Sequence, residues 1–182
     1  MIVFISGGCK NGKTKLGLDI ALKLSKDNKY YFATMLPFDD EDRERIENHK
    51  KERLNMGFNT IEKGINISDV SIDSSSTVLL DSLTALLLNE TFEAEKNGAD
   101  INLVSYKIIN DLDSLINKTK NIIIISDYIY SDGVVYNEYT ESFKKNLSNI
   151  DRWVASISDV VIERVVGINH FVKGSLKIWK NI

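Results

Sequence analysis

Residues 7–14 read Gly7-Gly8-Cys9-Lys10-Asn11-Gly12-Lys13-Thr14, which matches the phosphate-loop pattern G-x-x-x-x-G-K-[ST]. A short apolar run, Ile2-Val3-Phe4-Ile5, precedes the loop, and a helical pattern follows it, as the motif requires. Glycines let the backbone curl so that its N–H groups point at phosphate oxygens, at the positive end of the following helix. We therefore predict a nucleotide-phosphate site. The alternative is a glycine-rich turn that carries Lys-Thr by chance, and the flanking strand and helix argue against it.

Further apolar runs resemble the first one and predict additional buried strands: 77–80, 122–125, 160–162 and, more weakly, 30–33. Helical patterns lie between them, at 13–26, 41–55, 83–96, 103–118 and 138–157. Strands that are apolar on both sides and alternate with helices indicate a parallel sheet covered on both faces. The predicted class is α/β, a P-loop NTPase-type (RecA-like) mostly parallel sheet with helices on both faces.

The composition is that of a folded globular protein. Of 182 residues, 43% are hydrophobic and 27% are charged, which excludes a disordered or collagen-like chain. The length, the single proline and the lack of a Gly/Ser-rich linker predict one domain over 1–182. Lys and Arg number 23 against 26 Asp and Glu, a net charge of -3, so no general attraction to nucleic acid or to anionic lipid is expected.

The cysteine count and the apolar runs bear on the cellular compartment. One cysteine, Cys9, can form neither an internal disulfide nor a cysteine metal cluster, which excludes a structural zinc site of that kind. No uncharged apolar run reaches the length of a membrane span, and no signal-peptide pattern is found at Met1 to Ile5. The expected location is the cytoplasm.

Specific side chains of the phosphate site can be assigned from the chemistry of phosphoryl transfer. Lys13 would reach the β- and γ-phosphates, and the hydroxyl of Thr14 would bind Mg²⁺. Asp81 follows the strand at 77–80 and either orients toward the metal or caps the helix that begins after Ser82. Asp127 follows the strand at 122–125 and could cap a helix, bind metal or contact substrate.

Residues 39–53 form a predicted helix that is almost free of apolar side chains. Arg45, His49 and Arg53 are spaced i, i+4 and i+8, which places an imidazole between two guanidinium groups on one face. Guanidinium groups bind phosphate oxygens, and a neutral imidazole nitrogen can attack phosphorus. The alternative is a solvated face held by pairs such as Glu41 with Arg45. The other histidine, His170, is expected to be structural.

Three stretches together resemble one family, the bifunctional adenosylcobinamide kinase/adenosylcobinamide-phosphate guanylyltransferases of cobalamin biosynthesis. The stretches are the loop at 7–14; Tyr31-Phe32-Ala33-Thr34 with Asp39-Asp40-Glu41 and Arg45-Ile46-x-x-His49-Lys50; and Leu79-Leu80-Asp81-Ser82-Leu83-Thr84. The resemblance implies phosphorylation of adenosylcobinamide by ATP or GTP, followed by GMP transfer from GTP through a guanylylated histidine. It also implies Mg²⁺, a corrinoid substrate and a homotrimer with active sites between subunits.

Carried over by position, the resemblance makes His49 the guanylylated nucleophile and gives Lys13 a catalytic part in phosphoryl transfer. Thr14 and Asp81 would hold the metal. The residues that the resemblance implies for nucleotide binding are Gly7, Gly8, Cys9, Lys10, Asn11, Gly12, Lys13, Thr14, Ala33, Thr34, Lys50, Lys51, Glu52, Arg53, Glu62 and Asp81.

The chain departs from the family pattern after the strand at 122–125. Asp127-Tyr128-Ile129-Tyr130 stands where the family has Asn-Glu-Val-Gly, and Asp151 stands where the family has a later asparagine. These departures keep two alternatives open. The first is a divergent P-loop protein that retains one activity, such as the kinase alone. The second is a non-catalytic GTP-binding regulator.

Overall fold

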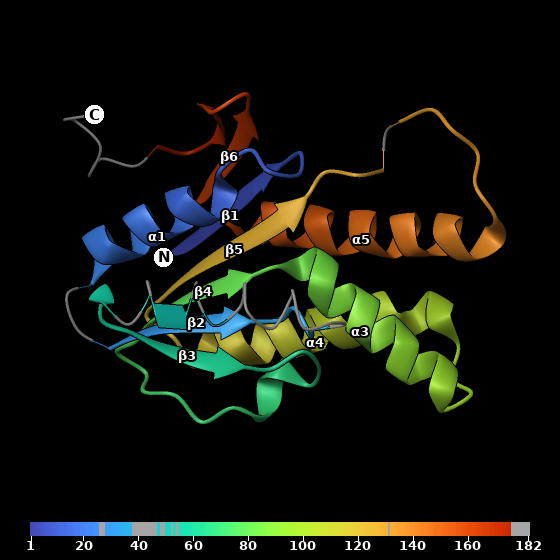
Figure 1. The fold of residues 1–182 in the computed structure, drawn as a ribbon, viewed down its shortest axis with the longest axis horizontal. Coiled ribbons are helices and arrows are strands. Elements are labelled where there is room, and N and C mark those ends of the chain that lie inside the picture. Colours follow the sequence, from blue (N-terminus) through green and yellow to red (C-terminus); the bar gives the residue numbers. More distant parts are fainter. Residues whose placement is uncertain are drawn as a thin grey trace.

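The computed structural model describes residues 1–25, 28–37, 47, 50–51, 53, 55–130 and 132–175. Its strands form one sheet in the order β3-β2-β4-β5-β1-β6-β7 (Figure 1). The strands are β1 (Ile2–Gly7), β2 (Lys29–Ala33), β3 (Phe58–Glu62), β4 (Thr77–Asp81), β5 (Asn121–Asp127), β6 (Val160–Val165) and β7 (Ile168–Lys173).

The sheet is parallel except at one edge, where β7 runs antiparallel to β6. β1 lies in the interior of the sheet, between β5 and β6. The helices are α1 (Lys13–Leu24), α3 (Leu83–Lys96), α4 (Val104–Asn117) and α5 (Glu138–Ile157). The predicted mostly parallel α/β sheet is confirmed.

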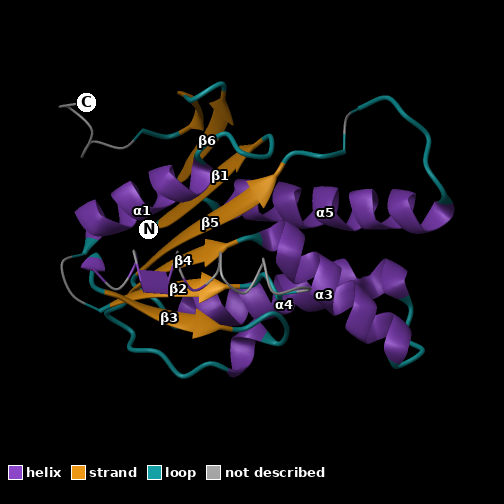
Figure 2. Ribbon diagram, in the orientation of Figure 1, coloured by secondary structure: helices purple, strands orange, loops and turns teal. Residues whose placement is uncertain are grey.

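Helices cover both faces of the sheet, and they cover them unequally (Figure 2). Alternate strand residues point to opposite faces. On one face Val3, Leu79 and Ile123 pack with Leu16 and Ile20 of α1. On the other face α3, α4 and α5 pack against the sheet, and this core is the larger of the two.

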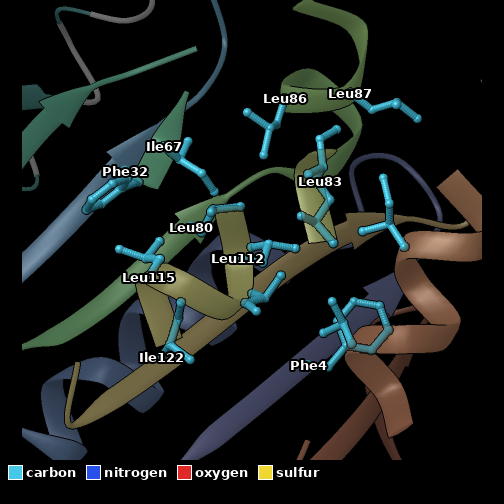
Figure 3. Close-up of a cluster of buried hydrophobic side chains, with 14 of the residues drawn as sticks. Phe4, Phe32, Ile67, Leu80, Leu83, Leu86, Leu87, Leu112, Leu115 and Ile122 are labelled. Atoms are coloured by element: carbon cyan, nitrogen blue, oxygen red, sulfur yellow. The ribbon is translucent and has the colours of Figure 1, made fainter. Parts of the chain in front are cut away.

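The larger core contains side chains from every layer on that side of the molecule (Figure 3). Phe4 and Leu80 come from the sheet, Leu83 from α3 and Leu112 from α4, and each is at most 3% exposed. Burial of such side chains stabilises a fold by about 1.5–3 kcal/mol each. This packing makes the carboxyl edge of the sheet a rigid platform.

The predicted helix boundaries agree closely with the structure where it describes them. The helices at 83–96 and 138–157 are confirmed, and the helix predicted at 103–118 forms as Val104–Asn117. The first helix ends at Leu24, because Ser25 has extended backbone angles. Most of the helix predicted at 41–55 lies outside the described residues, although residues 47, 50, 51, 53 and 55 are helical.

Two strands were not predicted, β3 and β7. Each is an edge strand, and neither carries a continuous run of buried apolar residues. In β3 only Phe58 is buried, and in β7 no residue is fully buried. His170, which was expected to be structural, lies on β7 with its side chain 72% exposed. No helix of the described part is long and apolar enough to cross a membrane.

Candidate functional site

The phosphate loop joins the end of β1 to the start of α1. Gly12 is the N-cap of α1, with a left-handed φ of 79°, and no side chain caps the helix there. The first turn of α1 carries no acidic residue. The free N–H groups and the positive end of the helix dipole therefore suit an anion such as a phosphate.

Lys13 is 6% exposed and is held inside the loop. Its Nζ donates to the carbonyl oxygen of Gly8 at 2.7 Å and to Oδ1 of Asp127 at 2.7 Å. Of the three roles that the sequence left open for Asp127, the structure shows none directly and gives it a partner, the loop lysine. This ion pair holds the ammonium at the loop, where phosphate oxygens would bind it.

Asp81 ends β4 and contacts the first turn of α1. Its Oδ2 accepts a hydrogen bond from Oγ1 of Thr14 at 2.7 Å. The helix cap that Asp81 might have supplied comes from Ser82, whose side chain accepts from the N–H of Ala85. The carboxylate is therefore directed at the phosphate loop and not at its own helix.

The Thr14–Asp81 pair has the donor chemistry that Mg²⁺ prefers, a hydroxyl oxygen and a carboxylate oxygen. Within the described ranges no group of three or more His, Cys, Asp or Glu side chains could hold a metal ion. A magnesium ion at this pair would therefore take its other ligands from water and from nucleotide phosphates, as Mg²⁺ commonly does.

Tyr31, on β2, is a site residue that the search for functional side chains missed. Its hydroxyl donates to the same Oδ2 atom of Asp81 at 2.6 Å. Burial, and then the nearby Asp81 carboxylate, raise the pKa of Tyr31 well above its usual range. The tyrosine therefore stays a hydrogen-bond donor at any physiological pH. In the sequence, Tyr31 stands in one of the stretches that resemble the family, but nothing there marks it as a site residue.

Three predicted nucleotide residues share one row at the carboxyl edge of the sheet. Ala33 is in register with Glu62 on one side and with Asp81 on the other. Nζ of Lys50 lies 2.9 Å from Oε1 of Glu62, and this hydrogen bond raises the pKa of Lys50. Residues 29 and 48 positions apart in sequence therefore meet at this edge.

Thr34 follows β2 and is fully buried. Its hydroxyl donates to the carbonyl oxygen of Ser82 and accepts from the N–H of Ser82. Its own carbonyl oxygen accepts from Nδ2 of Asn89, which also donates to the carbonyl oxygen of Gly64. Thr34 therefore fixes the loop after β2 against the start of α3, and its side chain is occupied in doing so.

The remaining predicted residues are dispersed around this site. Cys9 and Lys10 are exposed on the loop, and Lys51 is exposed on the helical segment. Arg53 is 6% exposed, and its Cζ lies 3.9 Å from the centroid of the Tyr31 ring. His49 and Glu52 lie outside the described residues.

Arg164, on β6, is a second residue that the sequence analysis missed. Its Nε donates to the carbonyl oxygen of Asn11, and Nδ2 of Asn11 donates to the carbonyl oxygen of Arg164. Its guanidinium also contacts Asn169. These contacts fasten the phosphate loop to the neighbouring strand. An arginine in a strand of mixed polarity offers no sequence signal for this role.

A buried carboxyl group, Asp151 on α5, lies behind the site. Its Oδ2 accepts from the hydroxyl of Tyr130 at 3.2 Å, and the residue is 3% exposed. Burial raises the pKa of Asp151 to about 7, and the charge of Asp127 adds to the shift. The contacts with Ser126 and Tyr130 act in the opposite direction. Two departures from the family pattern, Tyr130 and Asp151, thus contact each other.

Comparison with known families supplies the context for this geometry. The family model described as cobinamide kinase / cobinamide phosphate guanyltransferase matches residues 3–172. The chain belongs to this family. Membership in the cobinamide kinase / cobinamide phosphate guanyltransferase family makes the protein a transferase of cobalamin biosynthesis that uses a nucleotide and acts on a cobinamide substrate.

Two solved structures were compared with this member of the family. The flagellar accessory protein FlaH from Methanocaldococcus jannaschii has a TM-score of 0.48 and 14% identity, covering 96% of this chain and 78% of that one. An ATPase from the type III secretion system of pathogenic bacteria has a TM-score of 0.48 and 14% identity, covering 89% of this chain and 50% of that one. No curated protein matches the sequence significantly.

Proposed function

We propose that the protein phosphorylates adenosylcobinamide and then transfers GMP from GTP to the product, giving adenosyl-GDP-cobinamide. The observation that carries the proposal is the meeting of Lys13, Thr14 and Asp81 at the start of α1. The row formed by Ala33, Glu62 and Asp81 adjoins them at the same sheet edge. The site thus has one phosphate-binding centre and a neighbouring surface that both reactions could share.

In the kinase reaction, the aminopropanol hydroxyl of the corrinoid attacks the γ-phosphorus of ATP or GTP. A new O–P bond forms, the bond from the γ-phosphorus to its bridging oxygen breaks, and the hydroxyl proton is released to water. Lys13 would exchange its bond to Asp127 for phosphate oxygens and stabilise the charge that develops on them. Mg²⁺, held by Thr14 and Asp81, would neutralise charge on the phosphates.

In the guanylyltransferase reaction, an imidazole nitrogen of His49 attacks the α-phosphorus of GTP. A P–N bond forms and pyrophosphate leaves. A phosphate oxygen of adenosylcobinamide phosphate then attacks the same phosphorus, the P–N bond breaks, and His49 is regenerated. The nucleophile splits one displacement into two easier ones, with pyrophosphate as the first leaving group and the imidazole as the second.

We assign guanine-nucleotide binding to the sheet edge beside the phosphate loop. Ala33, Thr34 and Glu62 lie on or next to this edge, and Lys50 is bound to Glu62. Lys51 and Glu52 follow in the same segment, as does Arg53, whose buried side chain lies against Tyr31 instead. We further propose that the active protein is a cytoplasmic homotrimer, and sedimentation of the purified protein tests the trimer directly.

The test is the intact-protein mass after incubation with GTP and Mg²⁺, for the wild type and for His49→Ala. The proposal expects a gain of one GMP in the wild type only. A parallel assay follows phosphate transfer from ATP or GTP to adenosylcobinamide, which Lys13→Ala should abolish. An adduct that survives in His49→Ala would rule out the assigned nucleophile.

Two other outcomes select the alternatives. A wild type that phosphorylates adenosylcobinamide but gains no mass from GTP is a kinase alone. A wild type that binds GTP and shows neither activity is a non-catalytic regulator. The replacement of the family motif by Asp127-Tyr128-Ile129-Tyr130 makes both outcomes worth measuring, because Asp127 binds the loop lysine.

A further inference from the structure

Arg53 carries a positive charge in an unusually buried place. It is 6% exposed, and its Nε is buried without a hydrogen-bond partner among the residues that the structure describes. A buried charge is costly unless something compensates it. Among the described residues, one such compensation is the ring of Tyr31, whose centroid lies 3.9 Å from Cζ of Arg53, a distance typical of a cation–π contact.

The other end of Tyr31 reaches the phosphate site. Its hydroxyl and that of Thr14 donate to the same oxygen, Oδ2 of Asp81, at 2.6 Å and 2.7 Å. Tyr31 is itself 5% exposed, so its ring has little freedom to move away. An unbroken series of contacts therefore leads from Arg53 through Tyr31 and Asp81 to Thr14.

Arg53 also belongs to the segment that carries the proposed nucleophile. Lys50, Lys51 and Arg53 are helical, and the sequence predicts that His49 precedes Arg53 by one helical turn. Two contacts of its described residues attach the segment to the sheet. Lys50 binds Glu62 at the end of β3, and Arg53 packs on Tyr31 of β2. The first attachment is exposed, whereas the second is buried and is the more rigid of the two.

We propose that Arg53 and Tyr31 are positioning residues. They hold the segment that carries His49, the proposed guanylylated histidine, in a fixed position relative to the carboxylate of Asp81. The inference rests on the proposed function. It gives Arg53 a role different from direct phosphate binding, because its guanidinium is stacked on a ring in the interior.

The proposal predicts that loss of the Arg53–Tyr31 contact lowers the rate of adduct formation much more than it lowers the affinity for GTP. Loss of the Arg53–Tyr31 contact should slow the attack of His49 on GTP about tenfold to a hundredfold, because small displacements of a nucleophile have effects of this size. In Arg53→Ala, GTP affinity should change less than about threefold, since the phosphate loop and the Tyr31–Asp81 hydrogen bond are intact. Arg53→Lys keeps the charge but lacks the planar face, so it should restore only part of the rate.

The experiment measures the single-turnover rate of GMP adduct formation and, separately, the Kd of GTP. The variants are Arg53→Ala, Arg53→Lys, Tyr31→Leu and the double variant Arg53→Ala/Tyr31→Leu. Asn55→Ala is the matched control, because Asn55 is an exposed residue of the same segment. Circular dichroism checks that each variant is folded. Because the two residues act through one contact, the double variant should be no slower than the slower single variant.

The outcomes separate this inference from the function on which it rests. If the wild type forms no adduct, both the proposed guanylyltransferase function and the positioning role are wrong. A wild type that forms the adduct, with Arg53→Ala equally fast, overturns the positioning role alone. A rise in the Kd of GTP that matches or exceeds the loss of rate would make Arg53 a nucleotide contact and also overturn it. Slow adduct formation at nearly unchanged Kd, with partial rescue by Arg53→Lys, supports it.

Discussion

At the residue scale, the carboxylate of Asp81 links β4 to side chains of two other elements, β2 and α1. Two hydroxyl groups, from Tyr31 and Thr14, donate to one of its oxygens. Hydroxyl donors hold a carboxylate in one orientation. Asp81 is therefore oriented before a metal or a nucleotide arrives, and its charge matters more than its size.

Asp81→Asn tests this at nearly constant volume. The amide oxygen can still accept from Thr14 and Tyr31, but the negative charge that attracts Mg²⁺ is lost. We expect the Mg²⁺ concentration needed for half-maximal GTP binding to rise about tenfold or more. Titration of a fluorescent GTP analogue with Mg²⁺ measures it. Asp113→Asn, at an exposed position on α4, is the control, and an unchanged Mg²⁺ requirement in Asp81→Asn would contradict the metal assignment.

Asp151 couples stability to pH. In the folded protein its pKa is about 7, whereas an unfolded chain has a value near 3.8. Between these two values the unfolded chain has lost the proton that the folded protein retains. The free energy of unfolding therefore falls as the pH rises from about 4 to about 7. Above about pH 7 this group lowers it no further.

Asp151→Asn removes the loss of stability that ionisation of the buried carboxyl group causes, and its amide oxygen can still accept from Tyr130. The variant should gain stability over the wild type as the pH rises, by up to about 4 kcal/mol at pH 8, the free energy of a shift of about three units. Urea unfolding at pH 5 and pH 8 measures the difference. If the free energies of unfolding of the variant and the wild type differ by the same amount at pH 5 and pH 8, the carboxyl group does not titrate in this range.

Some site residues could be predicted from the sequence, and others could not. Lys13 and Thr14 follow from a local motif, because the phosphate loop requires them at fixed spacing. Tyr31 and Arg164 could not be found in this way. Their roles depend on which strands are neighbours and in what register, as when Ala33 aligns with Asp81. The sequence of a single strand does not contain that information.

At the element scale, β1 and β6 approach each other most closely beside the phosphate loop. Gly7 is in register with Arg164, and a Cβ added to Gly7 would overlap the carbonyl oxygen of that residue. The neighbouring Gly8 has more room, since an added Cβ there would meet only Nδ2 of Asn11 at 3.1 Å. Gly7 and Gly8, two of the three glycines in the loop, therefore have different structural requirements.

Gly7→Ala should separate β6 from β1 and destabilise the protein by about 1–3 kcal/mol, the usual cost of overpacking. The displaced loop should also bind GTP more weakly. Gly8→Ala is the matched control and should lose less than about 1 kcal/mol, because a side-chain amide can move aside. Denaturant unfolding of both variants measures the effect. Equal stabilities would show that β6 accommodates the methyl group.

The edges of the sheet account for the elements that the sequence did not predict. Interior strands such as β5 are buried on both faces and therefore read as continuous apolar runs. β3 and β7 have a neighbour on one side only, and their exposed residues need not be apolar. Their strand conformation comes from pairing with β2 and β6, which is a property of the assembled sheet.

At the scale of the whole molecule, one sheet includes strands from residue 2 to residue 173. Its two cores share the strands between them, so one cannot be lost while the other is kept. We propose from this that the chain is a single cooperative domain.

Cooperative unfolding predicts that different probes report one transition. In a Trp179→Phe background, Trp153 on α5 is the only tryptophan, and its fluorescence reports on one helix. Far-ultraviolet circular dichroism reports on all elements. The two urea curves should coincide in midpoint and slope. Separate midpoints would show that part of the sheet unfolds independently.

The place of β1 in the sheet also has a consequence for the nascent chain. Ile2–Gly7 leaves the ribosome well before its sheet neighbours β5 and β6, which begin at Asn121 and Val160. Until those strands have been synthesised, this apolar strand has no partner, and the loop that it carries has no fixed position. The active centre is therefore assembled only when β6 closes against β1, and until then a chaperone has an apolar strand to shield.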